Sequence, residues 1–278
     1  MTGKLFVVAT PVGNLADLSY RAAATLREVS VIACEDTRQT RKLLSHYGLA
    51  TPLVSYHEHN EADRARQLAD RMRQGEHVAL VTDAGTPLIS DPGYRIVRAA
   101  VELGIPVIPV PGPCAAIAAL SASGMATDSF LFGGFLPRKS AERRRRLEGF
   151  LADAGLTLIF YESPHRIVET LRDIEQVLGD PLIAAARELT KMHEEFLRGR
   201  ASEVRRLLEQ RGRVLGEFTL VIGKRESPPP ALAPDPSAEV QKLLEQGYGR
   251  MEAIKLVARR FGLPKRDLYR QLETKQSS

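Results

Sequence analysis

The sequence predicts an α/β protein built on parallel sheet. Short apolar runs, such as residues 5–9 and 78–81, alternate with segments of helical apolar spacing up to about residue 123. The turn after each apolar run is polar and carries glycine or proline, so these turns should gather at one sheet edge. The length of 278 residues and the 44% hydrophobic content suit about two such domains.

The first predicted domain covers residues 1–123. Its strands are expected at residues 5–9, 29–34, 53–56, 78–81 and 105–110. Its helices are expected at Tyr20–Glu28, 37–46, 61–74, 93–102 and 114–123. Asp36 or Thr37 is expected to cap the second helix and Asn60 the third. Asp91 followed by Pro92 is typical of a helix N-cap with proline in the first helical position.

The second predicted domain covers residues 124–226 and has a mixed α/β pattern. After an opening apolar stretch at 130–137, strands are expected at 156–161, 182–186 and 218–223. An arginine-rich helix is expected to be capped by Ser140. Ser163 and Pro164 are expected to cap and begin another helix, and a third covers 202–209.

A proline-rich segment separates the body from a small basic module. Residues 227–237 contain five prolines in eleven residues, which predicts an extended, semi-rigid linker. In the module, residues 238–278, helices are expected at 251–261 and 266–272 with a glycine-containing turn between them. This pattern describes a helix-turn-helix. A helical hairpin that docks on the body or on another subunit explains it about equally well.

The net charge of +5 is concentrated in two places. Residues 227–278 hold nine Lys/Arg against six Asp/Glu, an excess of +3. Residues 143–146 are four consecutive arginines, which would go most of the way round a helix. A helix packed on a core can carry them only if one arginine is paired or the helix projects. An extended anionic partner explains both clusters, and solvated helices with snorkelling side chains are the alternative.

Other sequence features limit the class of protein. No apolar run is long enough to cross a bilayer, and the N-terminus lacks the pattern of a secretory signal. The two cysteines form neither a disulfide framework nor a zinc pattern. A cytoplasmic location is therefore expected. No metal site is predicted, because the sequence places no third ligand beside His57 and His59.

The stretch TDAGTPLISDPG at residues 82–93 has the features of a ligand-binding turn. It follows a buried strand, and Gly85 would let backbone approach a ligand closely. Thr86 and Ser90 offer hydroxyls, and Asp83 offers a carboxylate. Neither G-x-G-x-x-G nor a phosphate loop follows any strand, so a pyrophosphate is not the expected anchor.

Seven motifs occur together along the body: ATPVGNL at 9–15, EDTR at 35–38, DAGTP at 83–87, VPGP at 110–113, GFLP at 134–137, YESPHR at 161–166 and RELTK at 187–191. On these motifs and the basic tail, the chain resembles the bacterial ribosomal RNA small subunit methyltransferase I family of the tetrapyrrole methylase superfamily. The resemblance implies two α/β domains of the tetrapyrrole methylase type with a cofactor cleft between them. It also implies a homodimer, S-adenosylmethionine as methyl donor, and methylation of a cytidine ribose 2′-oxygen in 16S ribosomal RNA near the decoding centre.

Two other functions are weighed against this one. A small-molecule methyltransferase of the tetrapyrrole kind would need no basic tail. The tetrapyrrole enzymes of the superfamily also usually carry a Gly-Asp-Pro version of the central turn, where this chain has DAGTP. A non-catalytic RNA-binding assembly factor would bind RNA without taking up the cofactor.

Methyl transfer to a hydroxyl needs aligned reactants and a proton acceptor. The catalytic candidates, on turns expected to face the cleft, are Glu35, Asp36, Glu162 and Lys191. Lys191 could serve only if desolvation lowered its pKa, and a helix cap paired with Arg38 explains Asp36 equally well. The predicted cofactor contacts are Pro11, Asp83, Ala84, Gly85, Thr86, Ser90, Pro111, Gly112, Glu188, Leu189 and Thr190. The predicted RNA contacts are Arg138, Lys139, Arg143, Arg144, Arg145, Arg146, Lys255, Arg259, Arg260, Lys265, Arg266 and Arg270.

Overall fold

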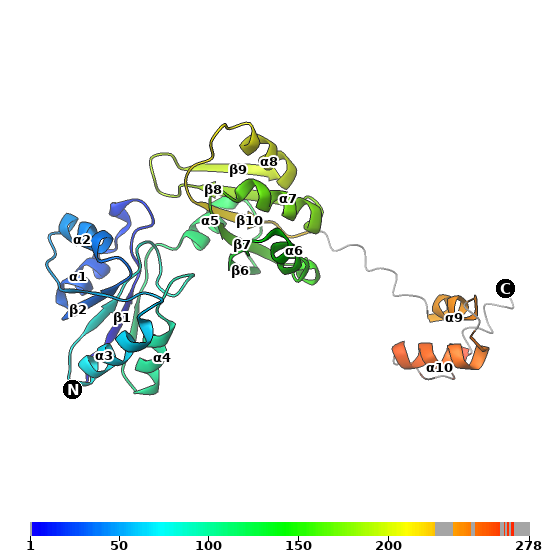
Figure 1. Cartoon of the computed structure of the whole chain (residues 1–278), viewed down its shortest axis with the longest axis horizontal. Coiled ribbons are helices and arrows are strands. Elements are labelled where there is room, and N and C mark those ends of the chain that lie inside the picture. The colour runs from blue at the N-terminus through cyan, green and yellow to red at the C-terminus, as the bar shows by residue number, and fades with distance from the viewer. Residues whose placement is uncertain are drawn as a thin grey trace. The chain divides into compact units, whose positions relative to one another are not determined.

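Figure 1 shows a computed structural model of the chain. The structure describes residues 2–225, 236–245, 248–261, 264, 266, 268 and 269, without the side chains of 237, 238 and 259–261. Met1–Arg225 form one compact unit, the body, and Glu226–Ser278 form a second unit, the tail. The predicted linker falls mainly on residues outside the described part. The domain boundaries at residues 123 and 226 stay predictions.

The first sheet of the body is parallel, as predicted. Its strands are β1 (Leu5–Val8), β2 (Val31–Cys34), β3 (Leu53–Ser55), β4 (Val78–Leu80) and β5 (Val107–Val110), in the order β3-β2-β4-β1-β5. The chain leaves β1 towards β2 and β3, whereas it leaves β4 for β5 on the other side. The border between β1 and β4 is therefore a topological switch point, where ligands of such sheets bind.

Helices cover both faces of this sheet. They are η1 (Leu15–Asp17), α1 (Tyr20–Glu28), α2 (Thr37–His46), α3 (Glu61–Arg73) and α4 (Tyr94–Glu102). Leu26 of α1 and Leu44 of α2 belong to the apolar cluster on one face. Met72 of α3 and Ile96 of α4 belong to the cluster on the other. The first half of the body is thus a doubly wound α/β unit.

The second half of the body has the mixed α/β content that was predicted, and its sheet combines parallel and antiparallel pairs. Its strands are β6 (Phe130–Phe135), β7 (Thr157–Glu162), β8 (Leu182–Arg187), β9 (Glu195–Arg200) and β10 (Phe218–Ile222), in the order β6-β7-β10-β8-β9. Only β6 and β7 pair in parallel. Its helices are α5 (Ala115–Ser123), α6 (Ser140–Glu148), η2 (Leu151–Asp153), α7 (Ile167–Leu178) and α8 (Ala201–Glu209). Strand β9 was not predicted, because this edge strand reads EFLRGR and has no apolar run.

Side chains alternate between the faces of the second sheet. Ile183 and Ala185 of β8 face the cluster that α6, α7 and α8 cover. Ala184 and Ala186 face α5 on the other side. This period of two is that of a strand buried on both faces. The small residues on the second face let α5, itself rich in alanine, lie close to the sheet.

Three predicted helix starts were wrong. Helix α4 begins at Tyr94, and its N-cap is Gly93 at φ 142°, so Asp91 and Pro92 belong to the preceding turn. A Cβ at Gly93 would lie 2.8 Å from Leu80 Cδ2, so glycine is required there on both counts.

The predicted starts of α7 and α6 also differ from the structure. Helix α7 begins at Ile167, because the Ser163 carbonyl accepts hydrogen bonds from the N–H groups of Arg166 and Ile167 in a separate turn. Ser140 is the first residue of α6 rather than its cap, and its hydroxyl donates to Asp173. The predicted cap Asp36 is confirmed for α2, since its carboxylate accepts from Arg38 N at 2.8 Å. Asn60 stands at the N-cap of α3 without a side-chain cap bond.

The tail contains α9 (Pro236–Glu245) and α10 (Arg250–Phe261). They share a small apolar core in which Val240, Ile254 and Leu268 are buried. Helix α9 was not predicted, whereas α10 was. Of the second predicted tail helix, 266–272, the structure describes only Arg266, Leu268 and Tyr269. Among the described helices, none is both long and apolar enough to span a membrane.

Candidate active site

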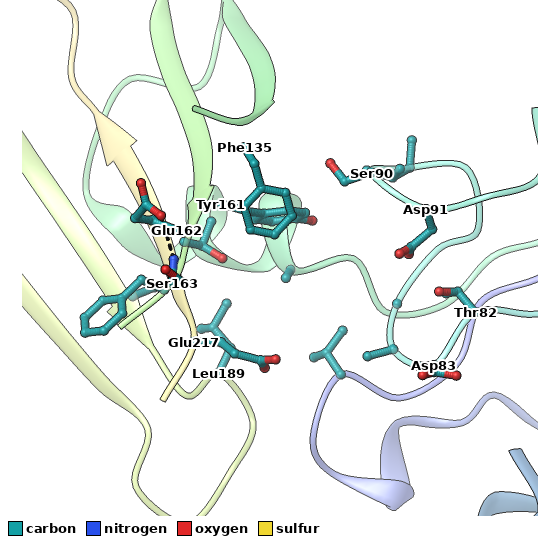
Figure 2. Close-up of a pocket in the computed structure, with 18 of the residues that line it drawn as sticks. Thr82, Asp83, Ser90, Asp91, Phe135, Tyr161, Glu162, Ser163, Leu189 and Glu217 are labelled. Atoms are coloured by element: carbon teal, nitrogen blue, oxygen red, sulfur yellow. Dashed lines mark hydrogen bonds between the residues drawn. The ribbon is translucent and has the colours of Figure 1, made fainter. Parts of the chain in front are cut away.

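The body holds a pocket of about 500 Å³ between its two α/β halves. This volume falls within the range of small-ligand sites, roughly 300–1,000 Å³. Residues 82–86 and Ser90 with Asp91 line one wall, and Phe135, Tyr161 and Glu217 belong to the other. Figure 2 shows the two sets facing each other across the pocket. The turn after β4, which the sequence predicts to bind a ligand, therefore lines this pocket.

Hydrogen bonds tie the neighbouring turns of the first sheet to this wall. Thr10 and Gly85 exchange backbone hydrogen bonds of 2.9 and 3.0 Å. The Thr86 hydroxyl donates to the Pro113 carbonyl at 3.0 Å. The expectation that the turns gather at one sheet edge is confirmed, because turns after β1, β4 and β5 are joined there.

The backbone of the 82–93 turn is held in an unusual conformation. Leu88 and Ser90 both have positive φ, 72° and 69°, as does Gly85 at 91°. For residues other than glycine this region costs about 1–2 kcal/mol each. Such strain collects at ligand-binding sites, where the surrounding structure maintains it.

The opposite wall is aromatic. The Tyr161 ring meets the rings of Phe132 and Phe135 edge to face, at centroid distances of 5.0 and 5.6 Å. Its hydroxyl oxygen accepts a hydrogen bond from Ala116 N at 3.2 Å. Burial raises the pKa of Tyr161, so the hydroxyl stays protonated. Tyr161 and Phe135 thus offer the pocket an apolar surface.

Carboxylates gather at the first wall. Burial raises the pKa of Asp83, Asp91 and Glu35, and the proximity of these carboxylates to one another or to Asp36 adds to each rise. Asp83 accepts a hydrogen bond from Asp36 N at 3.1 Å. Several desolvated carboxylates close together create a negative potential, so this wall favours a cationic ligand.

Three of the four catalytic candidates have other duties. The Asp36 carboxylate binds the Arg38 side chain and backbone, which lowers its pKa to about 2, so it is a poor base. Burial lowers the pKa of Lys191, but its hydrogen bonds and ion pairs with Glu188 and Glu217 together outweigh burial and leave the pKa raised, contrary to the condition under which Lys191 could act as a base.

Glu162 lines the pocket but is also committed to the fold. Its side chain is fully buried and accepts from Ser163 N at 2.7 Å, drawn in Figure 2, and from the Thr170 hydroxyl at 2.6 Å. It also pairs with Arg166 at 3.1 Å. With its lone pairs engaged, Glu162 positions the start of the turn that follows β7. Glu35 remains as a candidate. It does not line the pocket, but its exposed side chain is near enough to Asp83 and Asp91 of the pocket wall for these carboxylates to add to the rise in its pKa.

The cofactor candidates divide into two groups. Asp83, Ala84, Gly85, Thr86, Ser90 and Leu189 line the pocket. Pro11, Pro111, Gly112, Glu188 and Thr190 do not line it. Pro11, Glu188 and Thr190 are each next to a lining residue, whereas Pro111 and Gly112 precede Pro113, whose carbonyl accepts from the lining residue Thr86. Glu188 and Thr190 have positive φ, 51° and 64°, which shapes the turn carrying Leu189.

Sequence reasoning missed Glu217, Phe218 and Thr219 of the pocket. Strand β10 runs antiparallel to β7 and β8, with Phe218 opposite Glu162 and Arg187. The residues that begin β10 therefore lie at the edge where β7 and β8 end. A search of the turns that follow strands cannot find residues that precede one.

The predicted RNA contact at Arg143 is wrong. Its side chain is 1% exposed and donates to Asp173 at 2.7 Å. It is the paired arginine that a helix packed on a core requires. Arg144, Arg145 and Arg146 are exposed, as are Arg138 and Lys139. Lys255 and Arg266 are exposed on the tail, while Lys265, Arg270 and the side chains of Arg259 and Arg260 lie outside the described residues.

Comparison with known proteins decides the family. The family of Tetrapyrrole (Corrin/Porphyrin) Methylases matches residues 4–205. A ribosomal RNA small subunit methyltransferase I of Halalkalibacterium halodurans is 48% identical over 272 residues, 96% of this chain and 93% of that protein. The protein of the same name in Bacillus subtilis is 43% identical over 282 residues, 99% and 95% of the two chains. This chain belongs to the ribosomal RNA small subunit methyltransferase I family.

Solved structures agree on the fold. The uroporphyrin-III C-methyltransferase of Thermus thermophilus, solved with S-adenyl homocysteine, has a TM-score of 0.56 at 19% identity, covering 80% of this chain and 98% of that one. The predicted tetrapyrrole methylase fold is therefore confirmed. The chain is an S-adenosylmethionine-dependent methyltransferase.

The pocket suits this cofactor in its chemistry. S-adenosylmethionine carries a sulfonium and an ammonium group, and the acidic wall at Asp83 and Asp91 offers the negative potential that such cations need. The aromatic wall at Tyr161 and Phe135, with Leu189, offers apolar surface for the rest of the molecule. Gly85 and Ser90, which both have positive φ, also line the pocket.

Proposed function

We propose that this methyltransferase methylates the ribose 2′-oxygen of a cytidine in 16S ribosomal RNA, near the decoding centre of the small subunit. The relatives named ribosomal RNA small subunit methyltransferase I, which match over nearly the whole chain including the tail, support the ribosomal substrate. The cytidine and the 2′-oxygen follow from the motif resemblance. The enzyme works in the cytoplasm, as a homodimer.

One observation supports the proposal for the site. The pocket lies where the two α/β halves of the body meet, and its acidic wall faces its aromatic wall. When bound, S-adenosylmethionine supplies an electrophilic methyl group. Asp83 and Asp91 bind the cationic end, and backbone at Ala84, Gly85 and Leu189 orients the molecule. Tyr161 and Phe135 exclude water on the far side. Rigid positioning of both reactants in such a site supplies most of the rate advantage.

The reacting hydroxyl also needs a proton acceptor at the pocket edge. Glu35 serves this role, because burial and the neighbouring carboxylates raise its pKa towards the working range of a general base. Asp36 instead fixes the start of α2, and Lys191 holds the β8–β9 turn through Glu188 and Glu217.

The substrate is tested with labelled S-adenosylmethionine on three acceptors: purified small subunits lacking the modification, free 16S ribosomal RNA, and uroporphyrinogen. The expected result is label in 16S ribosomal RNA, mapped to a cytidine that becomes resistant to alkaline cleavage at its 3′ side. Label in uroporphyrinogen alone would identify a tetrapyrrole-type enzyme. RNA binding with no uptake of cofactor would identify an assembly factor.

The pH dependence of cofactor binding follows from the raised carboxylate pKa values. As pH falls through them, Asp83 and Asp91 become neutral and their attraction for the cationic cofactor is lost. The Kd, measured by calorimetry, should therefore rise as pH falls through the raised pKa values of these two carboxylates. Asp83→Asn should raise the Kd about tenfold at pH 7, the loss of roughly 1.4 kcal/mol, and flatten the profile.

The weaker binding at low pH should not come from unfolding of the protein. A carboxyl with a raised folded-state pKa binds its proton more tightly in the folded protein, so the cofactor-free protein gains stability from these groups as pH falls. Circular dichroism at each pH checks this. Asp63→Asn, an exposed carboxylate on α3 paired with Arg66, is the matched control and should leave the profile unchanged. An unchanged profile in Asp83→Asn would remove Asp83 from the cofactor site.

The tail is assigned to RNA binding. Deleting residues 227–278 should weaken binding to 16S ribosomal RNA and lower the slope of log K against log salt, because basic side chains release counterions from phosphates. Cofactor affinity should stay nearly the same, because the pocket is built from body residues alone. Calorimetry and RNA titrations at several salt concentrations measure both. Loss of cofactor affinity would show instead that the tail is a structural or dimer element.

A further inference from the structure

A groove on the body, separate from the pocket, is lined by Leu15 of η1 and by Thr37, Arg38, Arg41, Lys42, Ser45 and His46 of α2. We propose that this groove, called here the α2 groove, binds the phosphate backbone of the RNA strand that flanks the methylated nucleotide. The inference rests on the proposed function and adds a second RNA-binding surface to it. None of these residues is among the RNA contacts predicted from the sequence.

The pattern of α2 explains why its cations share one face. Thr40, Leu43 and Leu44 are buried against the first sheet. The opposite side of the helix is exposed and carries Arg38, Arg41, Lys42, Ser45 and His46. This is the spacing of an amphipathic helix, here with a basic outer face and no acidic residue within its bounds. From residue 38 to 46 the face extends about 12 Å along the helix, at 1.5 Å per residue.

The cations of the groove are available to a ligand. Neither Arg41 nor Lys42 forms an ion pair with a described carboxylate, and Lys42 makes only a 3.3 Å hydrogen bond to Gln39. Arg38 is paired with Asp36, yet its side chain is 87% exposed. Basic residues without acidic partners, set along a groove, are the electrostatic mark of a phosphate-binding surface.

Contacts between η1 and the end of α2 fix the shape of the groove. The Tyr47 hydroxyl, just past the end of α2, donates a hydrogen bond to the Leu15 carbonyl and so ties η1 to the helix. The rings of His46 and Tyr47 meet edge to face at 5.1 Å. Asn14 caps η1 by accepting from Ala16 N. The apolar Leu15 side chain, 41% exposed, gives the groove one surface suited to a ribose or base.

Both walls of the groove begin at the pocket. On one side, Val12 lines the pocket and Leu15, three residues later, lines the groove. On the other side, Asp83 of the pocket accepts a hydrogen bond from Asp36 N, and Thr37, the next residue, lines the groove. An RNA strand with its reacting ribose at the pocket can therefore continue directly into the α2 groove, where phosphate contacts would fix its register.

The test compares two double variants of the full-length enzyme. Arg41→Ala with Lys42→Ala removes two groove charges. Arg66→Ala with Arg73→Ala removes the same charge from α3, which covers the opposite face of the sheet, where both arginines are exposed. Binding to 16S ribosomal RNA is titrated from 50 to 300 mM salt, cofactor binding is measured by calorimetry, and methylation of small subunits is followed at several substrate concentrations.

The groove variant is expected to bind RNA about tenfold more weakly near 100 mM salt and to lose about 1 in salt slope for each phosphate contact removed. Its KM for the particle should rise while kcat changes little, because such contacts serve ground state and transition state alike. Its cofactor Kd should match that of the α3 variant. Equal RNA affinity and salt slope in the two variants would overturn the proposal that the α2 groove binds RNA. If the unaltered enzyme labels no 16S ribosomal RNA, it is the proposed function that fails.

Discussion

Replacing Arg143 by alanine is expected to lower the free energy of unfolding by about 3–5 kcal/mol, although the residue lies within a run of four arginines that suggests RNA binding. The Arg143 side chain is 1% exposed, and its Nε donates to Asp173 at 2.7 Å. Its Nη1 donates to the carbonyl of Arg138 at 3.2 Å. Truncation would leave the Asp173 carboxylate, 7% exposed, without its principal partner. Urea unfolding measures the loss.

Two variants separate a structural role from an RNA-binding one. Arg145→Ala, on the exposed side of the same helix, should change stability by less than about 0.5 kcal/mol while weakening RNA binding. Arg143→Met combined with Asp173→Leu should recover much of the lost stability, because an apolar pair leaves no buried charge uncompensated. If Arg143→Ala unfolds like the unaltered protein and loses RNA affinity, Arg143 would be a surface residue after all.

The arginine run marks the limit of what sequence patterns resolve. Helical spacing shows that one of four consecutive arginines must point inwards, but it does not say which one. The choice of Arg143 depends on Asp173 of α7, thirty residues later in the chain, and on the two carbonyls that end the stretch after β6. Such contacts are tertiary, so local periodicity cannot report them.

The same contrast separates the predicted parts of the pocket from the missed ones. The turn at 82–93 was predictable, because parallel strands put their carboxyl ends at one edge and the turn chemistry is local. Glu217 was not, because its place depends on β10 running antiparallel beside β7. The helix starts at Asp91 and Ser163 were wrong because both residues belong to the pocket wall, where a ligand site rather than a helix cap sets the backbone.

The roles of neighbouring carboxylates also cannot be read from the sequence alone. The residues EDTR at 35–38 identify a polar turn, yet the two carboxylates differ in role. Hydrogen bonds from Arg38 lower the pKa of Asp36, whereas burial and the nearby carboxylates raise the pKa of Glu35. Assignment of acid–base roles thus needs the neighbours of each group, which for Glu35 include Asp83 and Asp91 from a turn far along the chain.

Replacing Gly13 by valine is expected to raise the cofactor Kd and lower kcat, the latter by about 100-fold, since a displacement of about 1 Å at a reacting site has effects of that size. A Cβ at Gly13 would lie 2.5 Å from Lys191 Cγ and 3.0 Å from the Leu189 carbonyl oxygen. Gly13 follows β1 in the first half of the body, whereas Leu189 and Lys191 belong to the turn after β8 in the second. The added side chain must therefore push apart two segments that flank the pocket, and the Leu189 backbone cannot move aside as a side-chain tip could.

The displaced turn is itself part of the pocket, because Leu189 and Lys191 line it, and Lys191 also holds Glu217 at 3.0 Å. The defect should accordingly appear in cofactor calorimetry and single-turnover methylation more than in thermal stability, where overpacking at one contact costs about 1–3 kcal/mol. Gly155→Ala is the matched control, since a Cβ there meets nothing within 4 Å. A Gly13→Val enzyme with unaltered cofactor affinity and kcat would mean that the two halves are free to separate at this contact without disturbing the site, and that the β8–β9 turn takes no part in binding the methyl donor.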